Sequence, residues 1–197
     1  MKANFQKVIL AVLAITAVAC SSPKQLLKNE NFDASITKAI KKVRGAGDRA
    51  KLKNLATVGE AFYEANERNL ISIQSLESAN RPENWKTINS LYNRIIARQN
   101  KVAPYVAQAA ELGIDLSGNM VDYNEAELDS RKRAAFHEYK TAEDLIALAR
   151  SGDKISARRA YNRLVEIDRY FHFYKDKELL KSEAIELGRE DIFVSVD

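Results

Sequence analysis

One pattern occurs twice in this chain, first as Leu91-Tyr-Asn-Arg-Ile-Ile96 and again, 69 residues later, as Ala160-Tyr-Asn-Arg-Leu-Val165. The same offset aligns apolar and aromatic positions of the preceding segments: Leu70, Ile73 and Leu76 with Tyr139, Ala142 and Leu145. Spacings of three and four place such residues on one face of a helix. The repeat therefore predicts two helical hairpins on one plan. Its offset is about twice the roughly 34-residue period of tetratricopeptide repeats.

Helical periodicity extends outward from these hairpins over most of the chain, which contains only seven Gly and three Pro in 197 residues. We expect helices over residues 32–43, 48–78, 82–102, 105–112, 124–149, 154–174 and 176–187. The predicted fold class is all-α. Antiparallel hairpins stack either as a tetratricopeptide-like solenoid or as an irregular bundle. Only Asp191-Ile-Phe-Val-Ser-Val196 has a strand-like pattern.

The first twenty residues have the layout of a secretory signal. Lys2 and Lys7 precede an apolar run from Val8 to Ala19, and a run of about 12 residues is shorter than the ~20 that a membrane-spanning helix needs. Ala17-Val-Ala-Cys20 resembles a bacterial lipobox, which implies that the Cys20 thiol carries diacylglycerol and, after cleavage, becomes the N-terminus. The alternatives are a buried N-terminal helix with an incidental Cys and a signal cut at an ordinary site.

We expect four segments along the chain. Residues 1–19 are a signal peptide, 20–30 a lipid-anchored tether, 31–188 a helical repeat domain and 189–197 a strand-like tail. Ser21 follows Cys20 in place of an Asp retention signal. Resemblance to other bacterial lipoproteins therefore implies a location at the outer membrane, facing the periplasm.

Several further motifs resemble uncharacterised tetratricopeptide-like bacterial lipoproteins, in the N-terminal helical part of these longer envelope proteins. They include Phe32-Asp-Ala-Ser-Ile-Thr-Lys-Ala-Ile40, Glu60-Ala-Phe-Tyr-Glu-Ala-Asn-Glu-Arg-Asn69, Arg81-Pro-Glu-Asn-Trp85 and Ser151-Gly-Asp-Lys-Ile-Ser-Ala-Arg158. The resemblance implies a scaffold and a location, and it carries no catalytic residue. Longer members of the family continue past the last helix into a further domain.

The sequence contains no motif typical of catalysis or metal binding. The chain has two His, at His137 and His172, and its one Cys is assigned to lipid. A zinc site needs clustered ligands at defined spacing. We therefore expect no catalytic residue, no metal and no cofactor, and predict that the chain is not an enzyme.

The densest aromatic stretch is Tyr170-Phe-His-Phe-Tyr174. Five successive rings would point around most of a helix, so some of them face either the helix over 176–187 or a partner. Exposed aromatic side chains are suited to protein contacts. The candidate partner-contact residues are Tyr170, Phe171, Phe173 and Tyr174, and the expected partner is another envelope protein or a peptide. Trp85 is expected in a hairpin core.

The formal net charge of +4 is unevenly placed. Lys2 and Lys7 belong to the signal, and residues 24–53 hold nine basic against three acidic residues. Basic residues beside a lipid anchor favour contact with anionic headgroups over nucleic acid, and a solvated helix face is the alternative. We expect no nucleic-acid partner.

The predicted function is a membrane-anchored, non-enzymatic helical scaffold or protein-interaction module of the bacterial cell envelope. Stacked helical repeats commonly present binding surfaces of this kind. One alternative is a small-ligand carrier with a cavity inside the bundle. Another is the N-terminal part of an envelope enzyme whose catalytic domain is missing here.

Overall fold

The computed structural model describes residues 21–190. About 80% of the model is helical, and no strand occurs among these residues, which confirms the all-α prediction. The predicted signal peptide, Cys20 and the strand-like tail from Asp191 to Val196 lie outside the described residues. Within 21–190, no helix is both long enough and apolar enough to cross a bilayer.

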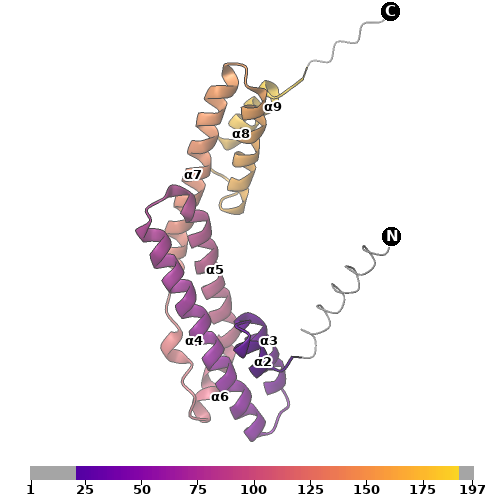
Figure 1. The fold of residues 1–197 in the computed structure, drawn as a ribbon, viewed down its shortest axis with the longest axis vertical. Helices are drawn as coiled ribbons and strands as arrows, with labels where there is room; N and C mark the ends of the chain where they lie inside the picture. The colour runs from indigo at the N-terminus through magenta and orange to yellow at the C-terminus, as the bar shows by residue number, and fades with distance from the viewer. Residues whose placement is uncertain (1–20, 191–197) are drawn as a thin grey trace, which may run out of the picture. The chain divides into compact units, whose positions relative to one another are not determined.

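The helices follow the predicted order (Figure 1). Their bounds are α2 Pro23–Lys28, α3 Phe32–Val43, α4 Asp48–Ser78, α5 Trp85–Val102, α6 Val106–Glu111, α7 Asn124–Arg150, α8 Lys154–Glu166 and α9 Lys177–Leu187. Short 3-10 turns occur at η1 Pro82–Asn84, η2 Ala103–Tyr105, η3 Ser117–Asn119 and η4 Ile167–Arg169. Turn η1 contains Pro82, at which the predicted helix over 82–102 begins. Turn η2 contains Pro104, which separates the predicted helices over 82–102 and 105–112.

The described chain divides into two compact units. The first unit comprises residues 21–72 and 94–122, and the second comprises residues 73–93 and 123–190. Helices α4 and α5 each contribute one end to each unit.

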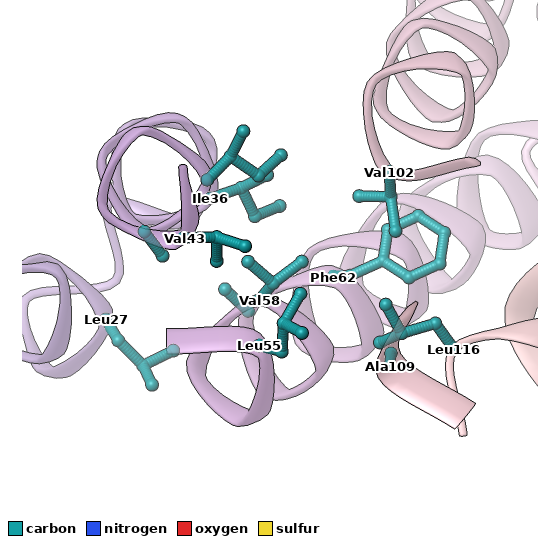
Figure 2. Close-up of a cluster of buried hydrophobic side chains, with 12 residues drawn as sticks. Leu27, Ile36, Val43, Leu55, Val58, Phe62, Val102, Ala109 and Leu116 are labelled. Atoms are coloured by element: carbon teal, nitrogen blue, oxygen red, sulfur yellow. The ribbon is translucent and has the colours of Figure 1, made fainter. Parts of the chain in front are cut away.

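The core of the first unit is made by α2, α3, α6 and parts of α4 and α5. Its buried side chains are Leu27, Ile36, Ala39, Ile40, Val43, Leu55, Val58, Ala61, Phe62, Val102, Ala109 and Leu116. Figure 2 shows Phe62 next to Val102 and close to Leu116. A Cβ on Gly59 would lie 3.1 Å from the Leu116 Cδ2. The absent side chain therefore lets the loop after α6 approach α4 closely.

The prediction of a tether over residues 20–30 is wrong for residues 23–28, which form helix α2. Ser22 caps this helix, because its Oγ accepts a hydrogen bond from the Gln25 N–H at 3.1 Å. The Ser35 hydroxyl of α3 donates to the Pro23 carbonyl at 2.8 Å. Leu26 and Leu27 are buried. The chain is thus part of the fold from Pro23 onward, because two adjacent leucines gain more by packing than by remaining in water.

In the second unit, α8 and α9 pack against α7 (Figure 1). The shared core consists of Ala135, Tyr139, Ala142, Leu145, Ile146, Ala160, Leu164, Ile167, Leu180 and Ala184. The turn between α7 and α8 forms as predicted. Gly152 has a φ of 103°, and the Asp153 side chain accepts hydrogen bonds from the Ile155 and Ser156 N–H groups.

The sequence repeat corresponds in part to a repeat of buried positions. Three pairs separated by 69 residues are buried alike, namely Ile73 with Ala142, Ile88 with Ala157 and Ile95 with Leu164. In contrast, Leu70 and Leu76 are half-buried, whereas their counterparts Tyr139 and Leu145 are buried. The shared Asn93 and Asn162 are both exposed, and Asn93 donates to the Asn89 carbonyl at 3.0 Å.

Candidate functional site

The aromatic segment from Tyr170 to Tyr174 is a loop, and the prediction that it continues a helix is wrong. Helix α8 ends at Glu166 and η4 ends at Arg169. The buried ammonium of Lys177 donates to the carbonyls of Phe171 at 3.0 Å and His172 at 2.6 Å. These acceptors are bound from α9, so the loop conformation satisfies them without a further helical turn.

The same lysine forms an ion pair with Asp168. Lys181 donates to the other oxygen of this carboxylate at 2.8 Å. The hydrogen bond from Lys177, followed by that from Lys181, lowers the pKa of Asp168 below its ordinary value. Lys177 and Lys181 of α9 thus hold the segment that follows α8 in place.

The four predicted partner-contact residues divide between the core and solvent. Tyr170, Phe171 and Tyr174 are partly buried and pack against the core of the second unit. Burial raises the pKa of Tyr170 to about 12. Phe173 is 86% exposed. One aromatic side chain therefore projects from the loop, while the other three hold the loop on the helices.

A groove of about 570 Å³ lies beside Tyr174, within the second unit. We call it the aromatic groove. It is lined by Pro82, Trp85, Lys132, Arg133, Phe136, His137, Lys140 and Tyr174. Three aromatic side chains and three basic ones thus surround one depression, and Phe136 is 51% exposed.

Cations lie over the aromatic rings of this groove and over the ring of the neighbouring Tyr139. The guanidinium of Arg133 lies 4.5 Å from the centre of the Trp85 ring. The ammonium of Lys175 lies 4.2 Å from the Tyr139 ring, 5.1 Å from Phe136 and 5.7 Å from Tyr174. Such cation–π contacts hold the Arg133 and Lys175 cations beside these rings. An occupant with carboxylates and apolar side chains would complement this surface.

Two basic side chains of the groove form ion pairs with neighbouring carboxylates. Arg133 donates to Asp129 at 2.8 Å, and Lys140 donates to Glu143 at 2.6 Å. The hydroxyl of Tyr139 donates to Asp176 at 2.5 Å. Burial, followed by this hydrogen bond, raises the pKa of Tyr139. Tyr139 is therefore a neutral donor that fixes the chain just before α9.

Sequence reasoning found Tyr174 but missed most of the groove. Trp85, predicted in a hairpin core, is half-buried and lines the groove instead. Its other missed residues have helical spacing on α7: Lys132, Arg133, Phe136, His137 and Lys140. That one-sided cluster was a usable signal, because these spacings form a single face.

No group of three or more His, Cys, Asp or Glu residues that could hold a metal ion occurs in the part of the chain that the structure describes. Comparison of the chain with protein-family models, curated proteins and solved structures found no match.

Proposed function

We propose that this protein is a lipoprotein of the bacterial cell envelope, anchored through Cys20, whose helical domain binds a partner protein through the aromatic groove. The lipobox and Ser21 support an anchor in the outer membrane, on the periplasmic side. The groove supports a binding role, since concave sites that join aromatic anchors to a few polar groups are typical of recognition surfaces.

The observation that carries the proposal is the arrangement around Phe136. Its half-exposed ring lines the groove together with Trp85 and Tyr174, and the Lys175 ammonium lies 5.1 Å from its centre. The expected partner segment is acidic and contains an apolar side chain. The cations would pair with its carboxylates, and the rings would cover its apolar part.

Site-specific photocrosslinking in cells tests the groove. A photoreactive phenylalanine is placed at Phe136, at Phe173 or, as a matched control, at Leu148. Phe136 and Leu148 lie on the same helix and are 51% and 54% exposed. We expect Phe136 and Phe173 to give adducts with the same envelope protein, and Leu148 to give none. Equal adducts at all three positions, or none at Phe136, would contradict the proposal.

A charge reversal provides the second arm of this test. Lys132→Glu should reduce the Phe136 adduct roughly tenfold, in line with ~1–2 kcal/mol of charge pairing at an interface. Lys154→Glu is the control, because Lys154 lies at the start of α8, away from the groove lining. An adduct that both variants weaken equally would show that only net charge matters.

The anchor is tested separately. Cys20→Ala should abolish labelling by a fatty-acid probe and release the protein from the membrane fraction, because more than one acyl chain is needed for stable attachment. Cys20→Ala protein that still fractionates with membranes and takes up label would rule out this anchor.

A small-ligand carrier is the second candidate, favoured by the volume of the groove. Its 570 Å³ falls in the range of roughly 300–1,000 Å³ that small-molecule sites occupy. Native mass spectrometry of protein purified from the envelope should then show an added mass that Trp85→Ala removes. Wild-type protein without an added mass, together with a Phe136 adduct, would decide for the protein partner.

A further inference from the structure

The net positive charge of the described chain lies entirely in the first unit. Residues 21–72 and 94–122 contain 13 basic against nine acidic residues, or +4. Residues 73–93 and 123–190 contain 16 of each and are neutral. The anchor candidate Cys20 directly precedes the charged unit in sequence. An anionic surface near Cys20 would therefore attract the first unit.

Three of these lysines surround one depression. A pocket of about 590 Å³ is lined by Leu26, Asp33, Ala34, Thr37, Lys38, Lys41 and Lys101. The Lys101 ammonium donates to the Thr37 hydroxyl at 3.1 Å, which draws the end of α5 to α3. The Thr37 hydroxyl itself donates to the Asp33 carbonyl at 2.8 Å, so the donors that this pocket provides for a phosphate group are its ammonium groups.

The only carboxylate lining this pocket is already engaged. Asp33 accepts hydrogen bonds from Arg98 at 2.8 and 3.2 Å, and the Arg98 side chain is 4% exposed. The negative charge of Asp33 is therefore compensated from inside the fold. The pocket presents an excess of positive charge to whatever occupies it.

The length of chain between Cys20 and the fold limits where this pocket lies. Helix α2 begins at Pro23, only three residues after Cys20, and three extended residues span about 10 Å. The Debye length at physiological salt is about 8 Å. An acyl group on Cys20 would therefore hold the start of α2 within about 10 Å of the headgroups, a distance slightly longer than one Debye length.

We propose that the α2–α3 side of the first unit lies on the bilayer and that the pocket of Lys38, Lys41 and Lys101 binds the phosphate of an anionic phospholipid headgroup. This inference extends the proposed lipid anchor, because the short connection from Cys20 brings the pocket to the membrane. The acyl chains and the pocket are then two independent membrane contacts.

Vesicle binding without the acyl chain tests the pocket. The mature chain, residues 20–197 with Cys20→Ser, keeps every described residue and carries no lipid. We expect it to bind vesicles of equal parts phosphatidylglycerol and phosphatidylcholine, to lose affinity as salt is raised, and not to bind phosphatidylcholine alone. Equal binding to both vesicle types, or to neither, would overturn the proposal.

Matched variants locate the contact. Lys38→Gln, Lys41→Gln and Lys101→Gln combined should weaken vesicle binding on the order of a hundredfold, given about fivefold for each lysine near an anionic surface. The control removes equal charge from exposed positions of the second unit outside the aromatic groove, as Arg81→Gln, Lys154→Gln and Arg159→Gln. It should retain near wild-type binding. Both variant chains must show wild-type circular dichroism. Equal losses of vesicle binding in both would mean that the effect depends on net charge alone, and would overturn the proposed pocket.

Two outcomes separate the sources of the phosphate and the two proposals. Saturable binding of inorganic phosphate that abolishes vesicle binding would reassign the pocket to a free anion and overturn the membrane contact. Failure of Cys20→Ala to remove the lipid label would refute the anchor alone. Vesicle binding by the Cys20→Ser chain that depends on the three lysines would still support the pocket.

Discussion

The guanidinium of Arg98 is buried and donates two hydrogen bonds to the carboxylate of Asp33, at 2.8 and 3.2 Å. A further bond of 2.6 Å joins the same guanidinium to the Asn66 side-chain oxygen. The three residues belong to α5, α3 and α4. One arginine therefore connects three helices of the first unit.

Arg98→Met should lower the free energy of unfolding by roughly 3 kcal/mol, because Asp33 loses its partner and Asn66 keeps an unsatisfied acceptor. Urea denaturation followed by circular dichroism measures the change. Arg94→Met is the matched control on the same helix, where the side chain is exposed, and it should alter stability by less than about 0.5 kcal/mol. Similar values for both variants would refute a special role for Arg98.

Lys177→Met should also destabilise the protein by roughly 3 kcal/mol, since it leaves the carbonyls of Phe171 and His172 without their donor. Lys177→Met should speed the exchange of amide hydrogens in the loop over residues 170–174 more than it does in α7. Hydrogen exchange with mass spectrometry can show this difference. Lys154→Met, at an exposed lysine, should leave the loop protected, and an unchanged loop in Lys177→Met would contradict the argument.

The ion pair of Asp168 predicts a dependence of stability on pH. Lys177 and Lys181 lower the pKa of Asp168 in the folded state below the unfolded value of about 3.9. The folded state then binds fewer protons, so its stabilisation is present above pH ~4 and is lost as pH falls through the folded-state pKa.

Asp168→Asn isolates this contribution. Compared with wild type, the variant should be less stable by about 2 kcal/mol at pH 7, and the difference should shrink as the pH falls below 4. Urea midpoints from pH 7 to pH 2 measure it. A difference that stays constant over this range would mean that the charge of Asp168 contributes nothing.

Asp153→Ala should weaken the start of α8 and lower the thermal midpoint, because the carboxylate caps two backbone N–H groups. Hydrogen bonds from the Ser156 side chain and backbone lower the pKa of this carboxylate, so the effect should fade in acid. Asp144→Ala, within α7, removes an exposed carboxylate that caps nothing and serves as the control. Thermal midpoints of the two variants should separate accordingly.

The sequence alone determined where most helices begin and end. Gly45, Gly113 and Gly152 each adopt positive φ just after a helix, a conformation that glycine adopts without steric penalty. Spacings of three and four located the buried positions of both hairpins, including Ile73, Ile88 and their counterparts. These features are local, since a turn or a helix face depends on residues within a few positions of one another.

Tertiary structure decided the remaining features. Helix α8 stops before the aromatic loop because Lys177, on another helix, binds the loop carbonyls. Trp85 lines the aromatic groove because α7 brings Phe136 and Arg133 to it. Part of the predicted tether is helix α2, because Leu26 and Leu27 are buried in the folded chain. No helical pattern encodes these contacts, because each depends on the burial or charge of a side chain on another helix.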